Sequence, residues 1–171
     1  MARKILGIET ATTTGSVAVV GGNGVIAEYT LNIELTHSER LMATVERVLS
    51  DTGLAVRDLD GFAVSIGPGS FTGLRIGLAA AKGLALATNK PVLPVPTLQA
   101  LAWNLPFAQY PVCPLLDARK KEVYAAVYRA VENGLEQVME ASVISLQELS
   151  RRITERTIFT GEGARLFRDD I

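Results

Sequence analysis

Hydrophobic and polar residues follow one another along the first hundred residues in a pattern that predicts five strands and three helices. Short apolar runs bounded by glycine, proline or asparagine indicate strands, and longer stretches with apolar residues three and four positions apart indicate helices. The expected strands are residues 4–10, 16–20, 25–32, 61–66 and 92–95, and the expected helices are residues 37–51, 71–87 and 97–103. The resulting element order is β-β-β-α-β-α-β-α.

Polar residues that precede the helical stretches are expected to cap them. Thr36, with Glu39 three positions later, has the pattern of a capping box before the first helix. Ser70 precedes the second long helix, and Ser145, with Glu148 three positions later, precedes a helix in the second half of the chain.

After a linker at residues 104–111 the same order begins again. The expected elements are strands at residues 112–117, 122–129, 136–141 and 157–160 and a helix at residues 145–152. A duplicated β-β-β-α-β unit is typical of actin-like ATPases and sugar kinases. We therefore expect an α/β protein of the actin-like ATPase, ribonuclease H-like fold, with a mixed five-stranded sheet in the first lobe. The expected lobes are residues 1–105 and 106–171, the second being smaller and incomplete.

The composition indicates a globular protein and argues against several functional classes. Hydrophobic residues make up 48% of the 171 positions and charged residues 20%, a balance that disfavours disorder. The net charge of -1 lacks the basic surplus of a protein that binds a nucleic acid backbone by itself. No apolar run is long enough for a signal peptide or a membrane span. We therefore expect a cytoplasmic protein that contacts no membrane and contacts nucleic acid only indirectly.

Residues suited to catalysis or metal binding are few. His37 is the single histidine, whereas catalytic metal sites generally use about three protein ligands. The single cysteine, Cys113, lies in an apolar run and is expected to be a buried thiol. Ser65, Ser70 and Thr72 have no histidine near them in the sequence to act as a base. We expect no catalytic residue and no metal site.

The turn after the first strand reads Glu9-Thr10-Ala11-Thr12-Thr13-Thr14-Gly15 and has two interpretations. In actin-like ATPases the corresponding turn reads Asp-x-Gly-Thr/Ser, and its backbone N–H groups and hydroxyls bind phosphate. Here Glu9 stands where aspartate is usual, and Ala11 stands where glycine would help. The turn is either a vestigial phosphate turn formed by Glu9, Thr10 and Thr12, or a polar hairpin whose threonines satisfy its own backbone.

A glycine-rich segment joins the fourth strand to the second long helix and reads Gly67-Pro68-Gly69-Ser70-Phe71-Thr72-Gly73-Leu74-Arg75-Ile76-Gly77. Gly67 and Gly69 lie next to a helix N-terminus, where anions are favoured, although the segment is not a Walker A loop. Gly73, Gly77 and Ala81 recur every four residues and leave one side of the helix with almost no side-chain bulk. That side packs either against the chain's own core or against a partner helix.

The second half carries a charged turn, Asp117-Ala118-Arg119-Lys120-Lys121, at the position equivalent to the first turn. A phosphate turn needs small residues, but Arg119 and Lys120 have long side chains. Asp117 and Arg119 belong either to a vestigial anion-binding turn or to a solvated charged hairpin.

Three segments resemble the TsaB (YeaZ-type) family, the non-catalytic relatives of the TsaD/Kae1 tRNA threonylcarbamoyl transferases, called glycoprotease-like in older naming. The segments are Ile5–Thr12, Gly67–Gly77 and Leu116–Arg119 with Glu122–Tyr124, and the middle one is the most specific. In the catalytic relatives a His-x-x-x-His metal pair follows the fifth strand, and the resemblance places it on Thr97 and Leu101. Neither side chain binds a metal as an imidazole does. The glycine-rich second phosphate turn of those relatives is also replaced.

The resemblance implies a scaffold or activator subunit, not an enzyme, in the synthesis of N6-threonylcarbamoyladenosine at adenosine 37 of tRNA. It implies pairing with a TsaD-like transferase through the first two helices, a TsaE-like ATPase as further partner, and a homodimer in isolation. It implies no cofactor, with ATP or ADP binding weak or shared with partner subunits. A bulky residue at Gly77 would then block pairing in a folded monomer. The expected partner contacts are Leu41, Met42, Val45, Leu49, Leu74, Ile76, Gly77 and Ala81.

Two other functions are compatible with this fold class. A small-molecule kinase or ATPase would bind nucleotide between residues 9–14 and 117–121. A metallopeptidase is suggested only by the older glycoprotease name, and a single histidine disfavours it.

Overall fold

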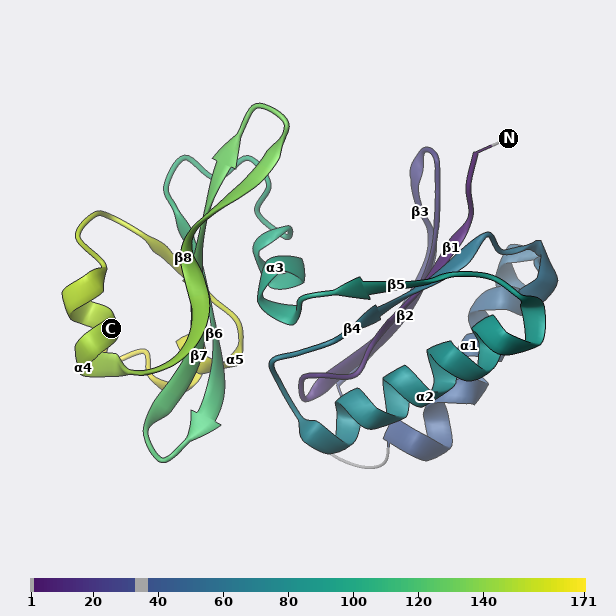
Figure 1. Ribbon diagram of the computed structural model, residues 1–171, viewed down its shortest axis with the longest axis horizontal. Helices are drawn as coiled ribbons and strands as arrows, with labels where there is room; N and C mark the ends of the chain where they lie inside the picture. Colours follow the sequence, from purple (N-terminus) through teal and green to yellow (C-terminus); the bar gives the residue numbers. More distant parts are fainter. Residues whose placement is uncertain (1, 33–36) are drawn as a thin grey trace. The chain divides into compact units, whose positions relative to one another are not determined.

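Strand β1 (Ile5–Glu9) lies at the centre of a five-stranded mixed sheet (Figure 1). It pairs antiparallel with β2 and parallel with β4, and the strand order is β3-β2-β1-β4-β5. This computed structural model describes residues 2–32 and 37–171. The sheet belongs to the first of two units, Met1–Val95, whose other elements are β2 (Thr14–Gly21), β3 (Gly24–Asn32), α1 (His37–Thr52), the 3-10 helix η1 (Val56–Asp58), β4 (Gly61–Ser65), α2 (Phe71–Thr88) and β5 (Val92–Val95).

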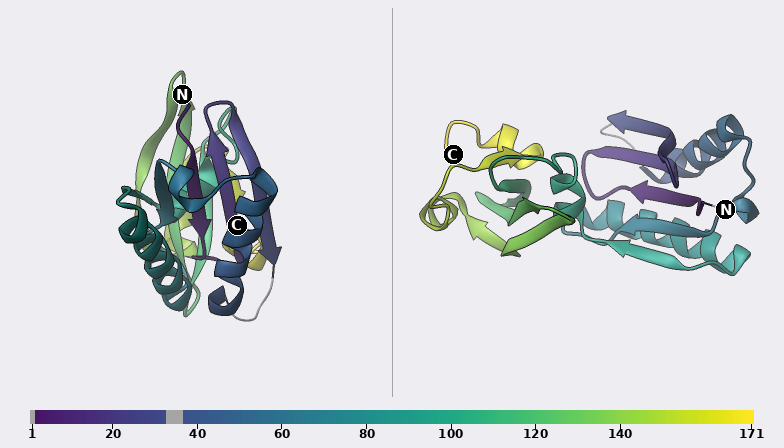
Figure 2. Two further views of the ribbon diagram at one scale, coloured as in Figure 1. Left: turned by 90° about the vertical axis from the view of Figure 1, so that its right-hand side faces the viewer. Right: turned by 90° about the horizontal axis from the view of Figure 1, so that it is seen from above.

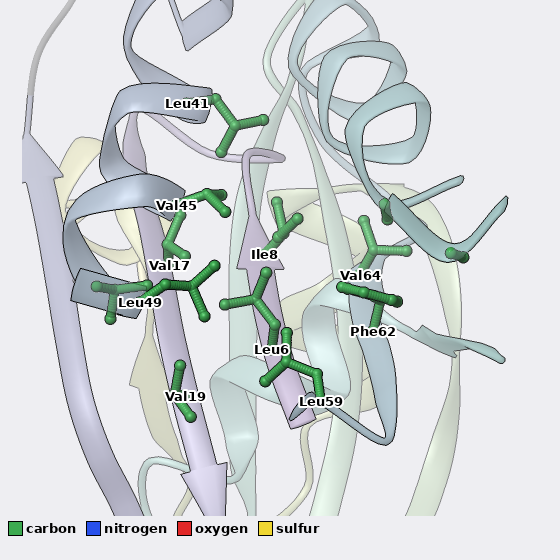
Figure 3. Close-up of a cluster of buried hydrophobic side chains, with 13 residues drawn as sticks. Leu6, Ile8, Val17, Val19, Leu41, Val45, Leu49, Leu59, Phe62 and Val64 are labelled. Carbon is green, nitrogen blue, oxygen red and sulfur yellow. The ribbon is translucent and has the colours of Figure 1, made fainter. Parts of the chain in front are cut away.

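Alternate residues of the central strands form the core of this unit, because successive side chains of a strand point to opposite faces. Leu6 and Ile8 of β1 pair in register with Phe62 and Val64 of β4, so all four lie on the same face. Helix α1 directs its buried residues toward them, as Figure 3 shows for Leu41, Val45 and Leu49. Buried alanines of α2 join the same cluster, so both helices cover one face of the sheet.

The backbone of helix α2 packs directly against the turn after β1, and the glycines of α2 make this close packing possible. An added Cβ at Gly73 would lie 1.9 Å from the carbonyl oxygen of Thr10. One added at Gly77 would lie 2.3 Å from the Thr10 hydroxyl, which donates a 2.7 Å hydrogen bond to the Gly73 carbonyl. Gly73, Gly77, Ala81 and Ala85 are all buried. The small-residue stripe therefore packs against the chain's own sheet.

The second unit, Pro96–Ile171, repeats this topology around β6 (Val112–Arg119). Its strand order is β8-β7-β6-β9, and β6 is again antiparallel to one neighbour and parallel to the other. Helix α3 packs on one face of the sheet and α4 on the other (Figure 1, Figure 2). The remaining elements are α3 (Thr97–Ala102), β7 (Glu122–Val131), β8 (Gly134–Ser145), α4 (Leu146–Arg152), β9 (Ile158–Thr160) and α5 (Glu162–Leu166).

Most predicted element boundaries agree with the structure within two residues, and the mixed five-stranded sheet is confirmed. The Ser70 and Ser145 caps are also confirmed, each accepting a backbone N–H at 3.2 Å. Thr36 lies outside the described residues. Strand β8 is longer than expected, α5 was not predicted, and α3 packs in the second unit. The boundary between the two units consequently lies after Val95 in the sequence, whereas we expected it near residue 105.

No helix within the described residues is both long and apolar enough to cross a membrane.

The two glycine environments of α2 predict opposite effects of the same substitution. We expect Gly73→Ala to lower the free energy of unfolding by about 3 kcal/mol, because the new methyl group would overlap backbone. We expect Gly83→Ala to raise it by about 0.5–1 kcal/mol, because an added Cβ at Gly83 meets no atom and alanine favours a helix. Denaturant unfolding of both variants measures the difference, and equal effects would contradict the packing described.

The Cys113 thiol is buried inside the second unit, and this burial raises its pKa from 9.0 to about 12. Since the thiolate is the reactive form, we expect its fraction to be roughly a thousandfold lower than that of an ordinary cysteine near neutral pH. A thiol reagent such as DTNB should react slowly with the folded protein and rapidly in denaturant. Equal rates in the two conditions would show that the thiol is accessible.

Candidate functional site

The turn between β1 and β2 contains the first group of predicted anion-binding residues, and the chain's own carboxylate occupies it. Glu9 Oε1 accepts the backbone N–H of Ala11 at 2.5 Å, and Oε2 lies 3.1 Å from the Thr12 hydroxyl. That hydroxyl also lies 2.8 Å from the Thr14 carbonyl oxygen, so its single proton serves one acceptor at a time. Turn groups that would contact a phosphate are thus engaged within the turn.

The segment between β4 and α2 lies directly against this turn. The backbone N–H of Ser70 donates to the Ala11 carbonyl oxygen at 2.6 Å. Gly67 and Gly69 have φ values of 108° and 152°, which favour glycine. An added Cβ at Gly69 would lie 2.3 Å from the same Ala11 oxygen. The two predicted phosphate segments are therefore brought together, and their contact is close backbone packing.

The turn between β6 and β7 has a similar arrangement in the second unit. Asp117 Oδ1 accepts the backbone N–H of Arg119 at 2.8 Å, and Oδ2 lies 3.5 Å from the Arg119 guanidinium. Lys120 and Lys121 form a two-residue hairpin turn in which both φ values are positive, 52° and 63°. In both units, a carboxylate near the end of the central strand accepts the N–H of the residue two positions later.

Thr97 and Leu101, the positions onto which the metal-binding histidines would fall, lie in or beside the core of the second unit. Thr97 is buried, and its hydroxyl has no hydrogen-bond partner within the described part of the chain. Leu101 is half-buried and packs against the core cluster that α3 forms with β6 and β7. No group of three or more His, Cys, Asp or Glu side chains arranged to hold a metal is found in residues 2–32 and 37–171. The His37 side chain falls outside what the structure describes.

The predicted partner contacts differ in their accessibility. Leu74 and Ile76 are half-buried, and Met42 is 47% exposed. The others are buried inside the first unit, namely Leu41, Val45, Leu49, Gly77 and Ala81. The structure corrects this part of the prediction, because a side chain that fills its own core is not available to another protein. A bulky residue at Gly77 would therefore disturb the fold of the monomer first.

The outward side of α2 has a second stripe of mostly small residues that was not predicted. Ala79, Gly83 and Ala87 are exposed, and each lies two positions after a buried member of the first stripe. Two positions correspond to about 200° around a helix, so this stripe lies on the opposite side. Phe71 and Leu86 are also exposed, at 69% and 85%. Because small residues recur every four positions on both sides of α2, periodicity alone does not distinguish the two stripes.

A groove of about 620 Å³ lies beside α1, η1 and α2. Its lining includes Met42, Ala43, Glu46, Ser50, Leu54 and Leu84. We call the surface formed by Met42, Ala43, Glu46, Ala79, Gly83 and Leu84 the α1–α2 face.

Helix α1 is fixed at the edge of the sheet by a polar network. The hydroxyl of Tyr29 on β3 donates to the Asp51 carboxylate, and Arg47 Nε donates to the same oxygen at 3.0 Å. The Tyr29 hydrogen bond and then the Arg47 hydrogen bond hold the pKa of Asp51 below its ordinary value. The network ties α1 to β3 and so helps to fix the outer surface of the helix.

The topology and the two turns define the class of this protein: an α/β protein of the actin-like ATPase fold in which, in each unit, a carboxylate near the end of the central strand accepts a backbone N–H of the following turn. The family model described as "TsaD: tRNA N6-adenosine threonylcarbamoyltransferase" matches residues 18–163. The "tRNA threonylcarbamoyladenosine biosynthesis protein TsaB" of Bacillus subtilis is 34% identical over 170 residues, covering 98% of this chain and 74% of that protein.

Other proteins of the same family also match this chain. The protein of the same description from Escherichia coli is 39% identical over 135 residues, covering 77% of this chain and 58% of that protein. Among solved structures, "YeaZ from Pseudomonas aeruginosa" superposes with a TM-score of 0.87 at 27% identity, covering 99% of this chain and 80% of that one. The chain belongs to the TsaB (YeaZ-type) family of tRNA threonylcarbamoyladenosine biosynthesis proteins, which confirms the resemblance.

The hairpin turn at Lys120 and Lys121 predicts a gain in stability from glycine. We expect Lys121→Gly to raise the free energy of unfolding by about 0.5–1 kcal/mol, because glycine adopts a positive φ at little steric cost. The same change at the exposed helical position Lys82 should lower it by about 1 kcal/mol. Thermal or denaturant unfolding compares the two, and a loss of stability in Lys121→Gly would contradict the turn conformation.

Proposed function

We propose that this chain is a non-catalytic scaffold or activator subunit in the synthesis of N6-threonylcarbamoyladenosine at adenosine 37 of tRNA. It docks to a TsaD-like transferase through the α1–α2 face, and a TsaE-like ATPase joins the assembly in the cytoplasm. In isolation the same face forms a homodimer. The chain uses no cofactor of its own and meets tRNA only through its partners.

The observation that carries this proposal is the accessible α1–α2 face. Gly83 is exposed, and a Cβ added there meets no atom, so a partner helix has room to approach the α2 backbone closely. Met42 and Ala43 of α1 expose further small or apolar surface beside the groove. A stable protein–protein interface buries about 800 Å² on each partner, so the partner contacts are expected to extend over both helices.

The non-catalytic role is supported by the chemistry of the two turns and of α3. Glu9 and Asp117 place negative charge against the backbone groups that would bind a phosphate. Thr97 and Leu101 supply a hydroxyl and an alkyl group where an imidazole pair would be needed. Together these features favour docking over turnover as the contribution of this chain.

The docking proposal predicts that Gly83→Arg weakens binding to the TsaD-like transferase of the same cell by about tenfold or more, because the arginine would separate the two helices. The monomer should stay folded, since the position is exposed and arginine favours a helix more than glycine does. Affinity is measured by calorimetric titration of the purified transferase, and homodimer formation by light scattering.

The matched control is Val25→Arg, which adds the same charge at a 61% exposed position on β3 of the same unit. It should bind as the unchanged protein does. The docking assignment fails if Gly83→Arg binds as tightly as the control, and the function fails if the unchanged chain does not bind the transferase.

A further inference from the structure

The β1–β2 turn has the donor groups of a small anion site. The N–H of Ala11 points at Glu9 Oε1 over 2.5 Å, and the residue is only 2% exposed. A buried N–H of this kind needs an acceptor, because water does not replace a lost partner there. The Thr12 hydroxyl, 3.1 Å from Oε2, can donate to the same carboxylate when it does not donate to the Thr14 carbonyl oxygen, which lies 2.8 Å away. The glutamate carboxylate therefore sits on the turn as a bound carboxylate or phosphate oxygen would.

A small cavity of about 30 Å³ adjoins this turn, which is room for about one water molecule. Glu9, Thr10, Ser16, Arg40 and Thr44 line it, together with Gly15, Val17 and Leu41. Removing the glutamate side chain would enlarge this space beside Arg40 and vacate the position of the carboxylate at the Ala11 N–H. The vacated space would suit a small oxyanion, since charged acceptors are favoured by N–H, hydroxyl and guanidinium donors.

We propose that the β1–β2 turn is an oxyanion site closed from within, and that the Glu9 carboxylate is its permanent ligand. The carboxylate satisfies the Ala11 N–H and keeps solution anions out by occupancy and by like-charge repulsion. In the second unit the Asp117 carboxylate likewise accepts the N–H of the residue two positions later, Arg119. There, however, the Arg119 guanidinium also lies 3.5 Å from the carboxylate. The proposal is independent of the docking function, because the turn and the α1–α2 face share no residue.

The test is chemical rescue of Glu9→Ala by small anions. We expect the thermal midpoint of this variant to fall by roughly 5 °C, because a buried donor loses its acceptor. Sodium formate or sodium phosphate at about ten times its dissociation constant should restore about 4 °C relative to sodium chloride of equal ionic strength. In NMR spectra the Ala11 amide resonance of the variant should shift saturably with formate. The unchanged protein should show neither response.

The matched control is Asp58→Ala, which removes a carboxylate that accepts the N–H of Ala55 at 2.8 Å in an exposed turn. Water can replace that acceptor, so formate should give this variant no more stabilisation than chloride does. Rescue of both variants to the same extent would indicate a general salt effect and would overturn the proposal. A folded Glu9→Ala protein with no formate response would overturn it as well.

Glu9→Ser keeps the test decisive if the alanine variant does not fold. A serine hydroxyl can accept a nearby backbone N–H in a local turn, yet it leaves the same space vacant. Formate or phosphate should then shift its Ala11 amide resonance and raise its thermal midpoint. An unchanged resonance in that variant would show that the turn does not bind anions.

Discussion

The contact between the turn after β1 and the first two turns of α2 is the constraint on which the first unit depends. The Thr10 hydroxyl bonds to the Gly73 carbonyl, and the space for any side chain at Gly73 is filled by Thr10 backbone. The N–H of Ser70 bonds to the Ala11 carbonyl, so the helix N-terminus is tied to the same turn. Segments far apart in the sequence are thereby fixed at van der Waals distance, and the helix direction follows from that attachment.

The same contact gives the glycine-rich segment its structural meaning. Glycine at positions 69, 73 and 77 permits close backbone packing inside the unit, since a Cβ at each would overlap Ala11 or Thr10. A glycine-rich strand-to-helix turn is commonly associated with phosphate binding, but here the small residues face another turn of the chain. Glycine richness in this segment is therefore explained by packing before any ligand is considered.

Local features of this fold were predictable from the sequence, and contacts between distant segments were not. The Ser70 and Ser145 caps and strand β5 depend on neighbouring residues, and they were placed correctly. The direction of the glycine stripe of α2 depends on Thr10, which is 63 residues away from Gly73 in the sequence. Periodicity identifies a stripe but not the surface that it meets, so Gly77 and Ala81 were assigned to a partner. The carboxylate contacts of Glu9 and Asp117 were missed for a different reason, because a turn sequence does not show which acceptor its N–H groups find.

The two stripes of α2 are related in their physical effect. The buried stripe fixes the helix on the sheet through backbone contacts, which leave less freedom than side-chain packing alone. The exposed stripe of Ala79, Gly83 and Ala87 is presented on that fixed helix. Binding to a rigid surface loses less conformational entropy than binding to a mobile one. Small residues on the inner side of α2 thus favour docking on its outer side, although no residue of the inner stripe would touch the partner.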